Sequence, residues 1–241
     1  MTSDKSSVVA IAPAFNEGKN IETILRLFPA QAVDQIVIVN DASSDDTGTR
    51  ARLAGAHVID HARRMGCGPA IRTGLDYAMK NNFDIAVIIA GNGKDDPRQI
   101  GRILECLQTE GADLVQGSRY LAGGLWANMP LHRRWGTRLY SFLFSCLCGK
   151  RITDGTNGFR ALRMSLLKDR RINLWQDWLN NYEVESYLLF KSIRLGYRIT
   201  EVGVSKLYPP GKPRGYTKMR PFLDWWSHFR PALLLRLGIK T

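Results

Sequence analysis

The chain has few cysteines, no long apolar run and fewer acidic than basic side chains, and these shortages exclude several classes of protein. Its cysteines, Cys67, Cys106, Cys146 and Cys148, match neither a disulfide framework nor a two-pair zinc site. No segment reaches the roughly 18 uninterrupted apolar residues of a membrane-spanning helix, and the apolar run before Pro13 is too short for a signal peptide. We therefore expect reduced thiols in a cytoplasmic chain that does not cross a membrane by itself.

The shortage of acidic residues leaves the chain strongly basic. Its 241 residues include 34 Lys and Arg against 22 Asp and Glu, a formal net charge of +12. Residues 191–241 hold eleven of these cations against Glu201 and Asp224, so +9 of the charge lies in the last fifth of the chain. Such a bias is typical of proteins that bind nucleic acid, acidic lipid or a phosphorylated ligand, and also of a solvated basic face. Because no helix-turn-helix, zinc or RNA-binding sheet motif accompanies it, we expect no nucleic-acid partner.

The order of apolar segments predicts an α/β fold. Short Val- and Ile-rich runs alternate with segments of helical periodicity, which indicates a Rossmann-like, mostly parallel sheet with helices on both faces. Ligands of such sheets bind beyond the carboxyl ends of the strands, where loops 13–18, 40–47 and 91–96 fall. The expected strands are 8–12, 35–39, 57–60, 85–90 and 113–116, and the expected helices are 20–28, 46–54, 69–80 and 97–108.

The first two loops carry side chains suited to a nucleoside. The segment PAFNE (13–17) places an aromatic ring, Phe15, and a carboxylate, Glu17, after a rigid proline. The ring can pack against a base, and the carboxylate can accept hydrogen bonds from hydroxyls or a base edge. Asp41 stands at the tip of the next strand, where it can accept from a base N–H. A glycine-rich turn at 63–74 suits a phosphate, but helix entry explains its glycines equally well.

Eight short motifs follow one another along the chain, and the ordered set is specific although each motif alone is weak. They are PAFNE (13–17), NDASSDDT (40–47), GCGPAIRTG (66–74), GSRYLAGG (117–124), PLHRRWGTR (130–138), DGTNGFRA (154–161), YEVE (182–185) and GYTK (215–218). From Val8 to about Met219 the chain resembles family-2 glycosyltransferases, in particular the polyprenyl-phosphate branch of the dolichol-phosphate mannose synthase type. The resemblance implies a GT-A fold, a UDP- or GDP-linked sugar donor, a polyprenyl or dolichyl phosphate acceptor and inversion at the anomeric carbon.

The same resemblance implies roles for particular residues. Guanidinium groups suit an acceptor phosphate because they pair bidentately with it and remain charged. Asp154, which precedes the Gly-Phe-Arg motif, is implied to orient the acceptor or the sugar. The implied nucleotide-sugar residues are Pro13, Phe15, Glu17, Asp41, Lys212, Arg214 and Lys218, the last three at the diphosphate, and the implied acceptor-phosphate residues are Arg119, Arg133 and Thr137.

One feature that the resemblance implies is missing, namely the ligands of a divalent metal. The family places an Asp-x-Asp and a further ligand after the fourth strand, where this chain has Ala90, Asn92 and Lys94. Hard cations such as Mg²⁺ and Mn²⁺ prefer anionic oxygen ligands, and an ammonium group repels them. We therefore expect no metal cofactor. We assign catalytic roles to Asn92 and Lys94, with Lys94 supplying positive charge to the donor diphosphate.

A shifted metal site at Asp95 and Asp96 is the alternative. Asp96 directly precedes Pro97, a residue tolerated in the first turn of a helix. A carboxylate at this point favours a helix N-terminus, so we expect Asp96 to have a structural role instead.

Two segments predict contact with an anionic membrane surface. Residues 139–148 and the tail at 221–241 combine apolar and aromatic side chains with cations and are too short to span a bilayer. For each segment the alternative is an ordinary core-packing helix. We divide the chain into a GT-A domain over residues 1–220 and an amphipathic basic tail over 221–241, and expect a peripheral protein on the inner face of the membrane.

The sequence thus predicts an inverting glycosyltransferase that moves a sugar from a nucleotide diphosphate sugar to a polyprenyl or dolichyl phosphate, with little or no dependence on a divalent metal. Two alternatives remain open. One is a non-catalytic sugar-nucleotide-binding or partner subunit, which the missing carboxylates favour. The other is a transferase that acts on a non-lipid acceptor.

Overall fold

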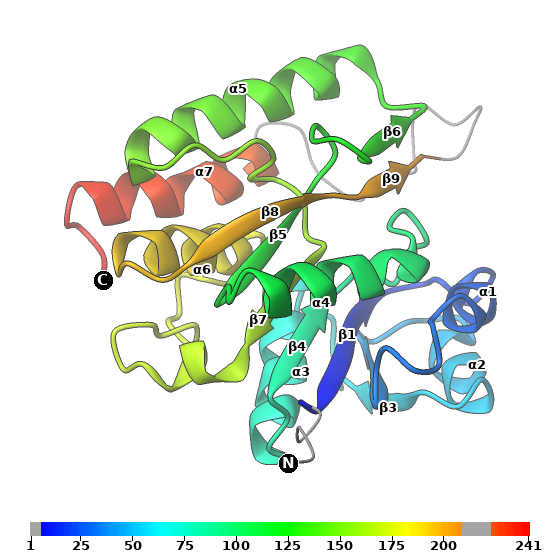
Figure 1. Cartoon of the computed structure of the whole chain (residues 1–241). Coiled ribbons are helices and arrows are strands. Elements are labelled where there is room, and N and C mark those ends of the chain that lie inside the picture. The colour runs from blue at the N-terminus through cyan, green and yellow to red at the C-terminus, as the bar shows by residue number, and fades with distance from the viewer. Residues whose placement is uncertain (1–5, 209–222) are drawn as a thin grey trace.

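A computed structural model describes residues 6–208 and 223–241, so Lys212, Arg214 and Lys218 lie outside the described residues. Strands and helices alternate over the first half of the chain (Figure 1). The strands are β1 (Val8–Ala14), β2 (Gln35–Asn40), β3 (His57–Asp60), β4 (Ile85–Ile88), β5 (Leu114–Ser118), β6 (Leu125–Ala127), β7 (Arg160–Arg163), β8 (Ile199–Gly203) and β9 (Ser205–Leu207). The helices are α1 (Ile21–Arg26), α2 (Thr47–Leu53), α3 (Cys67–Lys80), α4 (Ile100–Thr109), α5 (Leu131–Cys148), α6 (Glu183–Arg194) and α7 (Leu223–Arg236), and η1 (Pro97–Gln99) and η2 (Met164–Lys168) are short 3-10 turns.

The described strands form one large sheet and one small one. The large sheet has seven strands in the order β3-β2-β1-β4-β7-β5-β8, and β6 pairs with β9 in a separate ribbon. Neighbours in the large sheet run parallel, except that β7 is antiparallel to both β4 and β5. The crossovers place β1 beside β4, which brings the loops after these two strands together at one edge of the sheet.

Strand β1 shows why helices cover both faces of the sheet. Successive side chains of a strand point to opposite faces. Val9 and Ile11 pack in a core with α3, α5, α6 and α7, whereas Val8, Ala10 and Ala12 pack in a second core with α1, α2 and α4. All five are buried, so neither face of the strand is left to solvent. The mostly parallel α/β sheet predicted from the sequence is confirmed.

The elements expected in the first 116 residues are all present, within a few residues of their predicted bounds. The turn before α4 also follows the prediction, since Asp96 caps η1 by accepting a hydrogen bond from the backbone N–H of Arg98. The sequence analysis assigned no strand or helix to the segment that forms β7, in the middle of the sheet, nor to those that form α6, β8 and β9.

Helix α7 packs against α5 and α6, as Figure 1 shows for the three stacked helices. Gly136 of α5 permits a close approach, because a Cβ atom there would lie 2.4 Å from the ring of Trp225. Ala232 is fully buried, and Trp225 and Phe229 pack against the same core as α3 and α6. The C-terminal helix therefore completes the core next to the sheet, while the domain boundary at residue 220 stays a prediction.

Two findings bear on the absences noted in the sequence. All four cysteines are free, as expected for reduced thiols. In the ranges that the structure describes, no helix is both long enough and apolar enough to cross a membrane.

Candidate active site

A cavity of about 1090 Å³ opens at the carboxyl ends of β1, β2 and β4, where parallel sheets place their ligands. Its far wall comes from the start of α3, from α6 and from α7, which contributes Asp224 and His228. Of the residues that the sequence predicted for the site, Pro13, Phe15, Glu17, Asp41, Asn92, Lys94 and Arg133 line the cavity, whereas Arg119, Thr137 and Asp154 are not among its lining residues.

One end of the cavity presents an aromatic ring beside carboxylates. The guanidinium carbon of Arg64 lies over the Phe15 ring, 4.1 Å from its centroid. Glu17 lines the same end, and its backbone N–H donates to Thr47 Oγ1 at 2.8 Å. A flat apolar ring edged by a cation and an acceptor suits a nucleobase and its sugar hydroxyls.

Asp41 holds the entrance of α3 in place. Its carboxylate accepts hydrogen bonds from the backbone N–H groups of Met65 and Gly66 at 2.7 and 2.8 Å, and it lies 2.8 Å from Nδ1 of His61. Gly66 has φ of 102°, a left-handed conformation that only glycine adopts at little cost. The structure thus gives Asp41 a role in shaping the cavity wall, and its contact with a base stays a prediction.

The other end of the cavity is cationic. The ring of Tyr208 lies 5.5 Å from Nζ of Lys94 and 5.6 Å from the guanidinium carbon of Arg133. Lys206 lines the cavity beside them. Three cations from three different segments therefore gather where β4 ends, and this arrangement suits the phosphates of a ligand whose base lies at the aromatic end.

Lys94 is the most buried of these three cations, with 7% of its surface exposed. Burial, followed by repulsion from Arg133 and Lys206, lowers the pKa of Lys94 to about 8. Asn92 fixes the loop, because its Oδ1 accepts the backbone N–H of Lys94 at 3.2 Å. Because this ammonium group is desolvated and close to other cations, binding of an anion beside it is strongly favourable.

The residues at the end of β4 do not fit a divalent metal. Asp95 is buried and its Oδ1 lies 2.6 Å from Nζ of Lys206, while its Oδ2 accepts the backbone N–H of Ala90 at 3.2 Å. Asp96 pairs with the side chain of Arg98 at 2.8 Å. Within the part of the chain that the structure describes, no cluster of three or more His, Cys, Asp or Glu side chains could hold a metal ion. Both carboxylates of the shifted site are thus engaged in other contacts.

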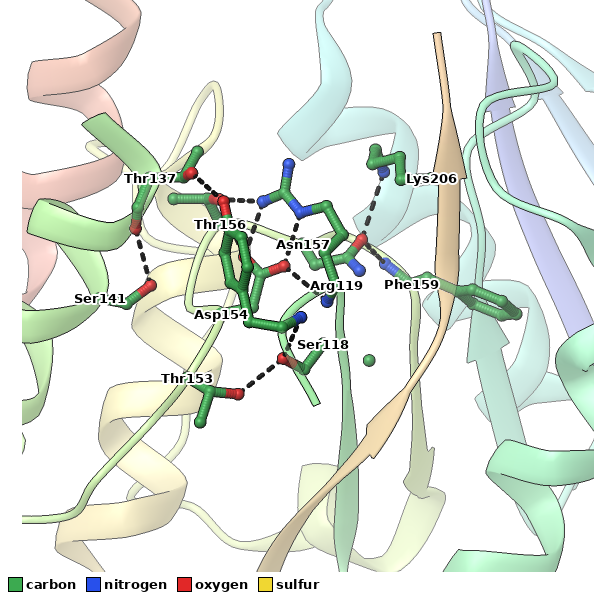
Figure 2. A network of polar contacts seen from close by, with 12 residues as sticks. Ser118, Arg119, Thr137, Ser141, Thr153, Asp154, Thr156, Asn157, Phe159 and Lys206 are labelled. Carbon is green, nitrogen blue, oxygen red and sulfur yellow. Dashed lines mark hydrogen bonds and ion pairs between the residues drawn. The ribbon is translucent and has the colours of Figure 1, made fainter. Parts of the chain in front are cut away.

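Arg119 and Asp154 form a buried pair behind the cavity (Figure 2). Two nitrogens of Arg119 each lie 2.6 Å from a different carboxylate oxygen of Asp154, and one of them also donates to Thr156 Oγ1 at 2.6 Å. Neither side chain is more than 3% exposed. The phosphate contact of Arg119 and the orienting role of Asp154 stay predictions, and the contacts seen here hold loop 153–159 against β5.

Thr137 belongs to the same layer behind the cavity. It is buried on α5, where its hydroxyl oxygen lies 2.6 Å from that of Tyr120. The same hydroxyl donates a hydrogen bond to the backbone carbonyl of Arg133 at 2.9 Å. The latter contact places Thr137 one helical turn behind Arg133, so within the described residues Arg133 is the predicted acceptor residue that reaches the cavity.

Several lining residues of the cavity were not predicted from the sequence, among them Arg64, Lys206 and His228. Arg64 precedes the glycine-rich turn and Lys206 precedes the basic loop motif, so their proximity to these motifs could have marked them as site residues. His228 had no such signal, since it comes from α7. Its Nδ1 is buried and has no hydrogen-bond partner among the residues that the structure describes, and burial lowers the pKa of His228 to about 3, which keeps the ring neutral.

The arrangement of sheet, helices and cavity defines the class of the protein as a GT-A glycosyltransferase fold. The glucosyl-3-phosphoglycerate synthase of Mycobacterium tuberculosis, solved with Mn²⁺, uridine diphosphate and phosphoglyceric acid, matches 98% of this chain and 80% of its own, with a TM-score of 0.71 and 24% identity. A structure of the same enzyme with Mg²⁺ and uridine diphosphate matches with a TM-score of 0.70 and 23% identity. At this level of identity the likeness supports the fold.

The chain belongs to glycosyl transferase family 2, whose family profile matches residues 9–171. The undecaprenyl-phosphate mannosyltransferase of Micrococcus luteus is 33% identical over 207 residues, which is 82% of each chain. The polyprenol monophosphomannose synthase of Mycolicibacterium smegmatis is 30% identical over 204 residues, 82% of this chain and 76% of its own. A UDP-N-acetylglucosamine–dolichyl-phosphate N-acetylglucosaminyltransferase of Methanococcus voltae is 28% identical over 96% of both chains. The resemblance to family-2 glycosyltransferases is thus confirmed, and the chain is a glycosyltransferase.

Proposed function

We propose that this enzyme transfers a sugar from a nucleotide diphosphate sugar, UDP- or GDP-linked, to a polyprenyl or dolichyl phosphate, with inversion and without a required divalent metal. The observation that carries the proposal is the polarity of the cavity. It has an aromatic and acidic end with Phe15 and Glu17 and a cationic end formed by Lys94, Arg133 and Lys206. The relatives of known activity that act on lipid phosphates support the choice of acceptor.

The chemistry follows from the charges of the reactants. An oxygen of the acceptor phosphate attacks the anomeric carbon, and the bond from that carbon to the donor phosphate breaks, with its electron pair leaving on the nucleoside diphosphate. The acceptor is already an oxyanion at neutral pH, so no strong general base is needed. Positioning the two phosphates and stabilising the leaving group account for the catalysis. Lys94 meets the leaving group, and Arg133 meets the acceptor.

The outer face of α5 supports an approach from a membrane surface. Leu131, Trp135, Leu139, Phe142 and Leu143 recur at helical spacing, and between 40% and 66% of each side chain is exposed. Their row begins two residues from Arg133, which lines the cavity. An exposed apolar row of this size on a helix that is too charged to span a bilayer is the mark of an interfacial helix.

The charge around this face favours an anionic bilayer as its occupant. Between Asp113 and Asp154 the chain contains no acidic residue. Arg134 stacks on Trp126 at 4.1 Å and Arg138 lies 4.8 Å from the ring of Tyr120, so cations flank the apolar row. Acidic lipid headgroups attract such cations while the apolar side chains enter the interface. Helix α5 is the better membrane contact of the two predicted segments, because α7 packs Trp225 and Phe229 against the core and exposes only Trp226 of its aromatic residues whose burial is described.

Flotation with lipid vesicles tests this surface. The double variant Trp135→Ser/Phe142→Ser should lose most of its binding to vesicles that contain acidic lipid, since burying each side chain contributes roughly 1.5–3 kcal/mol. Leu53→Ser is the matched control, because Leu53 is exposed on α2, away from α5 (Figure 1). Equal flotation of the double variant and the control would remove α5 from the membrane contact.

Transfer from labelled donors tests the proposed reaction. Purified enzyme with UDP- and GDP-sugars should form a lipid-linked product from a polyprenyl phosphate, and no product from the corresponding polyprenol, which lacks the phosphate. A product formed only on a water-soluble phosphate would establish the non-lipid alternative. Binding of nucleotide sugars without any product would favour the non-catalytic one.

A further inference from the structure

We infer that Lys206 joins Lys94 in binding the diphosphate of the nucleotide, and that Asp95 positions Lys206 instead of binding a metal. This inference rests on the proposed function, since it concerns the donor half of the same cavity. The ligand class is the pyrophosphate group of a nucleoside diphosphate. Asp95 and Lys206 lie 111 positions apart in the sequence, and the fold alone brings them together.

The backbone fixes Lys206 at the end of β4. Strand β9 passes the loop that follows β4, and Asp95 and Lys206 form an antiparallel bridge there. The N–H of Leu207 donates to the carbonyl of Lys94 at 2.7 Å. This hydrogen bond is part of the Asp95–Lys206 bridge and holds the backbones of the two lysines close together, so their positions do not depend on flexible side chains alone.

The contacts of Lys206 leave it able to bind an anion. Its ammonium group lies 2.6 Å from Asp95 Oδ1 and 3.2 Å from Asn157 Oδ1, the second of which Figure 2 shows. An ammonium has three N–H donors, and these two contacts use two of them. Lys206 lines the cavity with 13% of its side chain exposed, whereas the Asp95 side chain is fully buried. The lysine is therefore the member of the pair that a ligand can reach.

The charges explain why the pair can act in place of a metal. Lys94 and Lys206 together carry the two positive charges that a divalent cation would bring. The carboxylate of Asp95 offsets part of this charge and stabilises Lys206 beside the buried Lys94, which would otherwise repel it. Because both oxygens of Asp95 are already bonded, to Lys206 and to the N–H of Ala90, a metal would have to break these contacts to bind.

Binding of nucleoside diphosphates, without acceptor or turnover, tests the inference. Calorimetry with UDP and with GDP should give the wild type the same dissociation constant, within twofold, in EDTA and in Mg²⁺ or Mn²⁺. The double variant Asp95→Asn/Lys206→Gln removes the ion pair without leaving a buried charge alone. It should bind the preferred diphosphate at least tenfold more weakly and the free nucleoside unchanged, and Lys206→Arg should retain most of the affinity.

The controls separate binding from folding. Lys80→Gln changes an exposed lysine at the end of α3 and should bind like the wild type. Asp95→Asn alone should weaken diphosphate binding by the same factor in EDTA and in Mg²⁺ or Mn²⁺, because it loosens Lys206, whereas loss of a metal ligand would weaken binding only in the metal buffers. Thermal unfolding shows whether each variant is folded. If the double variant does not fold, the diphosphate affinity of Lys206→Arg is measured in its place.

Three results would overturn the inference: no binding of either diphosphate by the wild type, unchanged diphosphate affinity of a folded Asp95→Asn/Lys206→Gln, or a loss of wild-type affinity in EDTA that Mg²⁺ or Mn²⁺ restores. The proposed function fails differently. Metal-free binding of a diphosphate together with no transfer to any polyprenyl phosphate would contradict the function and support the lysine pair. Metal-dependent transfer would support the transfer to a lipid phosphate and contradict both the lysine pair and the metal independence.

Discussion

The two ends of the cavity lie on the same sheet but differ in charge. At the ends of β1 and β2 the cavity is lined by Glu17 and Asp41 beside the Phe15 ring, whereas at the end of β4 it is lined by Lys94 and Lys206 with Arg133 opposite. The first end has the side chains that the family resemblance implies, and the second has exchanged its acidic pattern for cations. In the proposed reaction, the nucleotide-binding end keeps the side chains of the family while fixed cations neutralise the diphosphate at the other end.

The largest expected effect comes from removing a cation at the second end. Lys94→Gln should lower the rate constant of transfer by about 100- to 1,000-fold, because one stabiliser of a leaving-group charge contributes roughly 2.7–4 kcal/mol. Binding of the free nucleoside should not change. Single-turnover assays with labelled donor measure the rate, and Lys80→Gln serves as the charge-matched control. A variant within a few-fold of the wild type would place Lys94 outside the reaction.

The next effect separates acceptor from donor. Arg133→Ala should weaken use of the polyprenyl phosphate by about 10- to 100-fold, since a hydrogen bond to a charged group contributes roughly 1.5–3 kcal/mol. The dissociation constant of the donor nucleotide should change much less. Initial rates over a range of acceptor concentrations, with calorimetry for the nucleotide, make the comparison. Equal losses in the use of the acceptor and in the affinity for the donor nucleotide would show that Arg133 contacts the donor.

A smaller effect follows from the lowered pKa of Lys94. The free enzyme keeps Lys94 charged below about pH 8 and loses that charge above it, whereas a bound diphosphate raises the pKa again. Affinity for the diphosphate should therefore be constant below pH 8 and fall above it by up to about tenfold per pH unit. Arg133 and Lys206 depress this pKa, and Asp95 and Glu17 oppose them. Lys94→Arg, which stays charged, should flatten the profile between pH 7 and 9.5. A wild-type affinity that does not fall above pH 8 would contradict this titration.

The smallest effect belongs to the aromatic end. Phe15→Ala should weaken nucleoside and nucleotide alike by about 2- to 10-fold, because an aromatic stacking contact contributes roughly 0.5–1.5 kcal/mol. The effect should be the same with and without EDTA. A loss confined to the diphosphate would show that Phe15 acts through Arg64 on the phosphates, and the division between the two ends would then be wrong.

The sequence carried enough signal to predict the first half of the fold. The apolar runs that become β1, β2 and β4 are buried on both faces, so their composition alone indicates strands of a covered parallel sheet. Strand β7 escaped prediction because its four residues, Arg160 to Arg163, begin and end with arginine. Arg160 is buried nonetheless, since its guanidinium donates to the carbonyls of Asn157 and Glu185. The contact with Glu185, 25 positions away, could not be read from the local sequence.

The candidate site divides in the same way. Glu17 and Lys94 follow parallel strands, whose topology brings them to one edge of the sheet, and Arg133 reaches the same cavity from the start of α5. Lys206 could not be predicted, because its place depends on the bridge to Asp95. The apolar pattern of the C-terminal tail indicated a helix, but the pattern does not distinguish a membrane surface from the core that Ala232 enters.

The central claim is that fixed cations, and no divalent metal, stabilise the leaving diphosphate while the sugar moves to a lipid phosphate. The most direct measurement is formation of labelled sugar-lipid by the full-length enzyme in EDTA, compared with the same reaction in Mg²⁺ or Mn²⁺. We predict rates that agree within about twofold in the three buffers. Loss of the product in EDTA, with recovery on adding either metal in excess, would contradict the claim.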